Sequence, residues 1–347
     1  MTDAQEQKQA RLAFIGAGGF ATSAIYPQIH KVPQIDLIAV CDLVREKAER
    51  NARNFGARRV YVDLNKMLDE EELDGVFVIG PAPQQYELAP AVLRRGIPVY
   101  VEKPSANTAA EAKKLAQLAK ENGTWGQCGF MKRFCYVYRM AKDIIARDEF
   151  GPLNMVTCHF GQGPYPQIWG MESAKRSMLV GQLVHIFDLT RFFGGDVASL
   201  SAVYHEVDEN RFAFLVNLRF KSGAVGQLDL NGLETVTGFR DIREWVKLVG
   251  LGSHVICEDM QRLRWQPQTD WNDLIPATGR YTNTYDPAWT GIADARANFG
   301  YLGEVEHFAL RCIGERDGGP DLWDSYEALR IAEAVYEATE SEETVEL

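Results

Sequence analysis

The sequence predicts a two-domain protein, with an α/β N-terminal domain on a doubly wound parallel sheet and an α+β C-terminal domain on a mainly antiparallel, open sheet. Its 347 residues are too many for one ordinary hydrophobic core. Short apolar and helical segments alternate as far as Gly129, and from Phe130 onward the pattern changes. We therefore expect domains at residues 1–129 and 130–347.

The N-terminal domain shows regular strand–helix alternation. Short apolar runs predict buried parallel strands at residues 12–15, 35–41, 75–79, 99–101 and 124–128. Helical segments are expected between them, at residues 21–30, 45–54, 86–94 and 109–121. The last helix has clear signals at both ends, because Thr108 and Glu111 have capping-box spacing and Gly123 suits a helix C-terminus. This alternation with short connections predicts the doubly wound sheet.

The second domain begins with helices and continues with strands. Helices are expected at residues 137–148, 179–193, 301–314 and 325–338. Alternating apolar residues between turn signals predict antiparallel strands at 197–204, 211–220, 224–230, 244–251 and 254–258. Residues 265–298 are rich in Pro, Trp, Asn and Thr, and we expect a long loop of functional importance there.

Composition excludes several kinds of partner. The net charge of −11 disfavours nucleic acid, and no apolar run reaches the roughly 18 residues that a membrane span requires. The first 11 residues lack the features of a secretory signal, so we expect a cytoplasmic protein. The 6 cysteines are scattered and are expected to be reduced. No metal site is expected, because metal-ligand spacing is absent.

A glycine-rich turn between a predicted strand and a predicted helix fits the G-x-G-x-x-A fingerprint of dinucleotide-binding Rossmann domains. Gly16 would make the tight turn, Gly18 would let the backbone approach a pyrophosphate, and Ala21 would let helix and strand pack closely. The expected cofactor-binding residues of this turn are Gly16, Gly18, Gly19, Phe20 and Ala21.

Asp42 ends the next predicted strand, about 20 residues further on, where a carboxylate can accept the ribose hydroxyls of the cofactor. An acid here would repel a 2′-phosphate, which favours NAD over NADP. Arg45 lies nearby and could moderate this repulsion, so NADP stays possible.

Glu102-Lys103-Pro104, which follows another predicted strand, completes a resemblance to the Gfo/Idh/MocA oxidoreductases. The resemblance covers nearly the whole chain and continues through residues 129–134, His185-x-x-Asp188, Gly250-x-Gly252 and Glu304-x-x-x-Phe308. It implies a substrate domain on an open antiparallel sheet, whose outer face commonly forms dimers or tetramers. We therefore expect a homodimer or homotetramer.

The resemblance implies two catalytic residues. Lys103 would lie beside the nicotinamide and take part in proton transfer, and His185 would be the base that acts on a substrate hydroxyl. A partly desolvated lysine near a cationic ring loses part of its preference for charge, and an imidazole titrates near neutrality. The plainer interpretations are a solvated loop lysine and a core histidine. Pro81 and Glu102 are expected near the cofactor.

Further substrate contacts are expected from Arg133, Trp169 and Gln182. Arg133 could bind a carboxylate or hydroxyl, or it could be a surface arginine. Trp169 could stack on a sugar ring, as could Tyr165, although single aromatics more often serve packing.

The sequence departs from the family pattern in two places. Family dehydrogenases often have an aspartate four residues before the histidine, where this chain has Gly181, followed by Gln182. Glutamine can hydrogen-bond a hydroxyl but cannot shuttle a proton at neutral pH. Gln85 stands where the family often has a histidine, and it is not an acid–base group. Lys103 and His185 therefore form a reduced pair.

The main hypothesis is an NAD(P)-dependent dehydrogenase that takes hydride from a secondary alcohol of a sugar, polyol or sugar derivative. One alternative is a glycoside-cleaving enzyme that oxidises its substrate transiently with tightly held NAD. The other is a ligand-sensing regulator that uses the same fold without catalysis. Release of NADH would distinguish the first from the other two.

Overall fold

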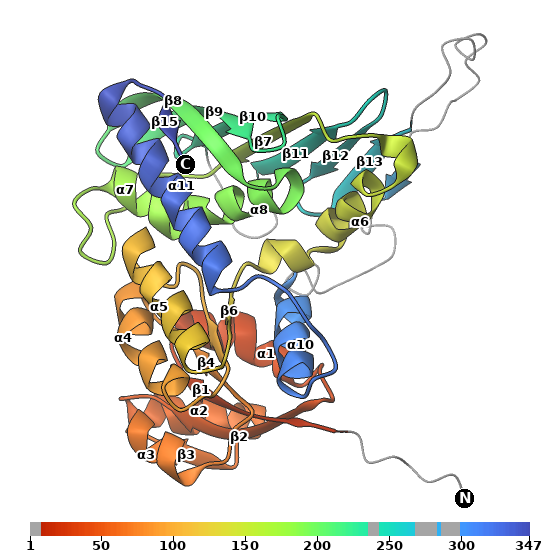
Figure 1. Ribbon diagram of the computed structural model, residues 1–347. Coiled ribbons are helices and arrows are strands. Elements are labelled where there is room, and N and C mark those ends of the chain that lie inside the picture. The colour runs from red at the N-terminus through yellow and green to blue at the C-terminus, as the bar shows by residue number, and fades with distance from the viewer. Residues whose placement is uncertain (1–7, 235–242, 268–282, 286–298) are drawn as a thin grey trace, which may run out of the picture. The chain divides into compact units, whose positions relative to one another are not determined.

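The computed structural model describes residues 8–234, 243–267, 283–285 and 299–347. The chain divides into two compact units (Figure 1). Unit 1 comprises Met1–Met131 and Tyr301–Glu327, and unit 2 comprises Lys132–Gly300 and Ala328–Leu347. Among the described helices, none combines the length and the apolar character needed to cross a membrane.

Unit 1 contains a parallel sheet of six strands in the order β3-β2-β1-β4-β5-β6. The strands are β1 (Ala10–Ile15), β2 (Ile35–Cys41), β3 (Arg59–Tyr61), β4 (Gly75–Val78), β5 (Val99–Val101) and β6 (Gly126–Cys128). This order is that of a doubly wound dinucleotide-binding fold, so the predicted fold class is confirmed. The sequence prediction missed β3, because Arg59 is exposed and polar and the strand shows no continuous apolar run.

Helices connect these strands. They are η1 (Ala21–Ile25, a π-helix), α1 (Tyr26–Ile29), α2 (Arg45–Phe55), α3 (Leu64–Glu70), α4 (Ala82–Leu93) and α5 (Ala109–Glu121). The capping box of α5 is confirmed: Thr108 Oγ1 accepts the N–H of Glu111, and Glu111 Oε2 accepts that of Thr108, both at 3.2 Å. Helix α4 begins four residues before its predicted start, because Pro83 is tolerated in a first helical turn.

Helix α10 (Tyr301–Cys312) packs into the core of unit 1 although it lies far away in sequence. The Phe308 ring makes edge contacts with Phe77 and Trp125, at centroid distances of 4.8 and 5.5 Å. A Cβ atom on Gly75 would lie 2.6 Å from the sulfur of Cys312. The glycine at the start of β4 therefore allows the helix to approach the sheet.

Unit 2 is built on a sheet of nine described strands in the order β14-β13-β12-β11-β7-β10-β9-β8-β15. The strands are β7 (Met155–Gly161), β8 (Val197–Asp208), β9 (Arg211–Phe220), β10 (Val225–Asn231), β11 (Arg243–Val249), β12 (His254–Glu258), β13 (Arg262–Gln266), β14 (Asn283–Tyr285) and β15 (Val345–Glu346). Only β7 and β10 pair in parallel among these strands, which agrees with the predicted, mainly antiparallel sheet.

The expected loop at 265–298 is wrong at two places, because Trp265 belongs to β13 and Asn283–Tyr285 forms β14. Residues 268–282 and 286–298 lie outside the described part of the chain. The prediction also missed β7, which lies in the middle of the sheet. Its side chains alternate between buried and half-exposed positions, but Thr157 and His159 interrupt the apolar pattern.

The helices of unit 2 cover one face of its sheet (Figure 1). They are η2 (Met131–Phe134), α6 (Tyr136–Ile145), η3 (Asp148–Phe150), α7 (Ala174–Met178), η4 (Leu179–Leu183, a π-helix) and α8 (Val184–Gly194). Helix α11 (Leu322–Ser341) begins in unit 1 and continues in unit 2. The two faces of the sheet therefore differ in exposure. On β9, Phe212 and Phe214 are buried on the covered face, whereas Leu215 on the other face is 47% exposed.

Candidate functional site

The glycine turn after β1 has the geometry that a phosphate-binding loop requires. Gly16 has a φ of +108°, and a Cβ atom there would lie 2.1 Å from the carbonyl oxygen of Ile79. Only glycine fits such a position. A Cβ atom on Gly18 or Gly19 would meet nothing within 4 Å, so one side of the turn is open. Phe20 follows with a ring 43% exposed, and Ala21 is buried at the start of η1.

Asp42 is fixed beside this turn, directly after β2. Its Oδ2 accepts the N–H of Ala17 at 2.7 Å, and its Oδ1 accepts the N–H of Val44 at 2.9 Å. Each carboxylate oxygen keeps a further lone pair for a ligand. The open glycine turn and this acid lie at the carboxyl ends of adjacent parallel strands, where such sheets bind ligands. These residues fit a dinucleotide, with its diphosphate at the turn and a ribose at the carboxylate.

Gln85 makes contacts with the Lys103 turn that the sequence did not reveal. It is fully buried on α4, which begins after the exposed Pro81. Its Nε2 donates to the carbonyl oxygens of Glu102 and Pro104, at 2.8 and 3.0 Å, and its Oε1 accepts the N–H of Glu102 at 2.8 Å. These three bonds hold the backbone on both sides of Lys103. The residue judged unfit for acid–base work thus positions the lysine turn.

Lys103 stands on this turn at the carboxyl end of β5. Its side chain is half-buried, and its backbone N–H donates to Glu102 Oε2 at 3.1 Å. The Lys103–Pro104 peptide bond is cis. Unit 1 therefore brings the glycine turn, Asp42, Pro81, Glu102 and Lys103 to one edge of its sheet.

Two buried carboxyl groups lie behind the lysine. Tyr100 donates its hydroxyl hydrogen to Glu102 Oε1 at 2.9 Å. Gly129 leaves room for this contact, because a Cβ atom there would lie 2.6 Å from the Tyr100 oxygen. Burial raises the pKa of Glu102 to about 7, although the Lys103 charge opposes the shift. Burial and the nearby Glu102 raise the pKa of Glu304, on α10, well above its usual value. The sequence pattern indicated Glu304 only as part of a motif.

In unit 2, His185 is buried at the second residue of α8, 6% exposed. Gln182 is half-buried in η4, just before it. Trp169 has a φ of +53°, uncommon for a residue with a side chain, and its ring lies 3.6 Å from where a Cβ atom of Gly181 would be. Unit 2 therefore brings Trp169 against the helical segment that carries Gln182 and His185.

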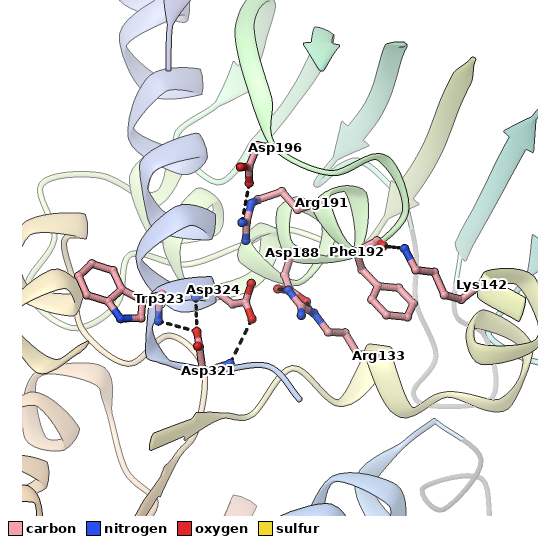
Figure 2. Close-up of polar contacts among 9 residues, drawn as sticks. All are labelled: Arg133, Lys142, Asp188, Arg191, Phe192, Asp196, Asp321, Trp323 and Asp324. Atoms are coloured by element: carbon pink, nitrogen blue, oxygen red, sulfur yellow. Dashed lines mark hydrogen bonds and ion pairs between the residues drawn. The ribbon is translucent and has the colours of Figure 1, made fainter. Parts of the chain in front are cut away.

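Arg133 has a partner within unit 2. Its Nε donates to Asp188 Oδ2 at 2.8 Å and its Nη2 to Oδ1 at 2.6 Å (Figure 2). The guanidinium also lies 5.6 Å from the centre of the Phe192 ring. Two of its nitrogens are thus bound to protein, and Asp188 braces this arginine. The expectation that Arg133 binds substrate stays a prediction, and two of its nitrogens already bind Asp188.

Comparisons with known proteins match both parts of the chain. Residues 10–130 match the model described as "Oxidoreductase family, NAD-binding Rossmann fold", and residues 142–347 match "Oxidoreductase family, C-terminal alpha/beta domain". The chain is 26% identical to scyllo-inositol 2-dehydrogenase (NAD(+)) of Bacillus subtilis (strain 168), over 96% of this chain and 94% of that protein.

Solved structures show the same fold. The crystal structure of a dehydrogenase from Chromobacterium violaceum superposes with a TM-score of 0.86 at 22% identity, over 96% of each chain. The structure of levoglucosan dehydrogenase in complex with NADH and L-sorbose gives a TM-score of 0.82 at 20% identity, over 98% of this chain and 99% of that one.

Proposed function

Because this chain belongs to the Gfo/Idh/MocA oxidoreductase family, with an NAD-binding Rossmann fold, we propose that it is a dehydrogenase acting on a secondary alcohol of a polyol, sugar or sugar derivative. The observation that carries the proposal is the edge of the unit 1 sheet, where Lys103 is held by Gln85 beside an open glycine turn and Asp42. The relative from Bacillus subtilis, which acts on an inositol, supports the substrate class.

Two side chains are assigned to proton transfer. His185 takes the proton of the substrate hydroxyl at its imidazole, and the Lys103 Nζ stabilises the alkoxide or relays the proton. A bound nicotinamide dinucleotide supplies the hydride acceptor. Gly16, Gly18, Gly19, Phe20 and Ala21 would hold its diphosphate, and Asp42 its ribose. Pro81 and Glu102 would lie on the nicotinamide side. Gln182, Trp169 and Arg133 would contact the substrate.

A homodimer or homotetramer is part of the proposal. Val203, Leu215 and Val225 lie on the uncovered face of the unit 2 sheet and are 66%, 47% and 44% exposed. Val203 and Leu215 are cross-strand partners, so they form part of one apolar surface. Burying such a surface against a second copy would be favourable. Light scattering after size exclusion gives the mass directly, and a monomer would contradict this part.

A cytoplasmic location is also proposed. All 6 cysteines are free thiols, which suits a reducing compartment.

The test of the function is an absorbance screen at 340 nm with NAD and with NADP against inositols, other polyols, sugars and sugar derivatives. The expected result is NADH formation with at least one polyol or sugar. Reduction of NADP alone would overturn the assignment of Asp42. Cofactor that co-purifies without any net NADH release would overturn the dehydrogenase proposal in favour of transient oxidation.

A further inference from the structure

Gly181 leaves room for a tyrosine on the helical segment before His185. A Cβ atom on Gly181 would lie 2.5 Å from the hydroxyl oxygen of Tyr165 and 2.9 Å from Cδ1 of Ile168. Real Cβ atoms do not approach other atoms so closely, so no other residue fits here unless Tyr165 moves. The absence of a side chain at position 181 is therefore what allows the Tyr165 hydroxyl to lie where it does.

This feature lies next to the candidate base. Gly181 is in the π-helical segment η4 and His185 is four residues later in α8. Four residues are close to one full turn in either helix type, so the two positions share a helix face. The phenol hydroxyl therefore lies on the His185 face of this helical segment, about one turn away.

The Tyr165 loop is held in place by its backbone. The N–H of Tyr165 donates to the carbonyl oxygen of Asn210 at 2.9 Å, and the N–H of Ile168 donates to Ser177 Oγ on α7 at 3.0 Å. Ser177 Oγ in turn donates to the carbonyl oxygen of Ser173 at 2.8 Å. The loop is thus tied both to the β8–β9 connection and to the helix that precedes η4.

The hydroxyl itself is available for a ligand. Within residues 8–234, 243–267, 283–285 and 299–347, this hydroxyl makes no hydrogen bond to another protein group, and Tyr165 is partly exposed. Burial raises the pKa of Tyr165 to about 12, so the phenol stays neutral and can donate a hydrogen bond at neutral pH. A neutral donor suits a ligand hydroxyl better than a ligand cation.

We propose that the Tyr165 hydroxyl is a substrate-binding group, which hydrogen-bonds a hydroxyl of the polyol or sugar beside His185, and that Gly181 makes its position possible. This inference rests on the proposed function and adds a specificity-determining residue to it. Gln182 and Trp169 lie next to Gly181, and together with Tyr165 they would contact the ring of the bound substrate.

The experiment compares Tyr165→Phe with the wild type on the best substrate of the screen and on its monodeoxy analogues. Loss of one hydrogen bond is expected to lower kcat/KM about 3- to 10-fold, with the KM for NAD and the Tm unchanged. One deoxy analogue should be used equally well by both proteins, because it lacks the hydroxyl that Tyr165 binds. Tyr204→Phe, which removes a hydroxyl that bonds Glu206 on β8, is the matched control and should behave as the wild type.

A second variant tests the packing independently of turnover. Gly181→Ala should lower the Tm, and adding Tyr165→Phe should restore part of it, because the closest contact is then removed. Equal loss for Tyr165→Phe on the substrate and on every deoxy analogue would overturn the inference, as would unchanged kinetics. A wild type that oxidises no polyol or sugar would instead overturn the proposed function.

Discussion

Arg133 and Asp188 form a two-point ion pair in which the carboxylate is fully buried and the guanidinium is 14% exposed (Figure 2). The pair joins η2 to α8, the helix that carries His185. Two parallel N–H···O bonds fix both position and orientation, which a single contact would not do. The ion pair therefore braces the helix of the candidate base.

Replacing Asp188 by Ala should destabilise unit 2 by about 3–5 kcal/mol, because the nearly buried Arg133 would lose its partner. Calorimetry or urea unfolding measures this. Asp196→Ala is the control, since the Arg191–Asp196 pair has an aspartate 51% exposed and should be worth less than about 1 kcal/mol. Additive losses in an Arg133→Met, Asp188→Leu cycle would show that the pair is not coupled.

Replacing Gln85 by Leu should lower kcat, because three backbone hydrogen bonds around Lys103 disappear while the volume is kept. Each buried backbone group left without a partner costs about 1–3 kcal/mol, so a lower Tm is also expected. Steady-state kinetics and NAD titration are the measurements. Gln84→Leu, on the exposed neighbour, should leave kcat unchanged. A Gln85→Leu protein with normal kcat would show that the hydrogen bonds of Gln85 do not position Lys103.

Replacing Lys103 by Met should spare cofactor binding and lower kcat about 10²–10⁴-fold, the usual contribution of a general acid–base group. NAD affinity follows from quenching of tryptophan fluorescence. The control is Lys114→Met, the same change on the exposed side of α5. Undiminished turnover in the Lys103 variant would remove this residue from the mechanism.

Glu102 and Glu304 should make stability fall as the pH rises. Burial raises both pKa values, so the folded protein holds protons that the unfolded chain has already released above pH 4.5, the usual glutamate value. The loss of stability extends to about pH 7 for Glu102, and Glu304 contributes a loss in the same direction above pH 4.5. One proton corresponds to about 1.4 kcal/mol per pH unit.

Glu304→Gln should remove the part of this pH dependence of stability that Glu304 contributes above pH 4.5. Urea unfolding between pH 5 and pH 9 measures the slope, with Glu306→Gln on the same helix as the control. Identical slopes in the Glu304 variant and the wild type would contradict the assignment.

Replacing Asp42 by Ala should raise the KM for NAD about 10- to 100-fold, because this factor corresponds to the loss of one hydrogen bond to a charged group. The preference for NAD over NADP should become smaller. The two cofactors are compared at 340 nm with one substrate. Asp36→Ala, near the other end of β2, is the control, because its carboxylate bonds Arg58 there. An unchanged cofactor preference would show that Asp42 does not contact the ribose.

The sequence was most informative where the signal is local. Helix α5 has its predicted bounds because its capping residues are neighbours in sequence, and strand β5 has them because its residues are apolar without interruption. The glycine turn was found for the same reason, since its residues are consecutive. Strand β7 was missed because its pairing partners are distant in sequence and two polar residues interrupt its apolar pattern.

The family and the fold class could thus be read from the order of short motifs along the chain. Only the tertiary structure revealed three relationships. Gln85 hydrogen-bonds the backbone of the Lys103 turn, Asp188 forms an ion pair with Arg133, and the Tyr165 hydroxyl lies against Gly181. Each of these pairs joins residues that are 16 or more positions apart in the chain. Sequence patterns report neighbours along the backbone, whereas hydrogen bonds and steric contacts depend on distances that only folding sets.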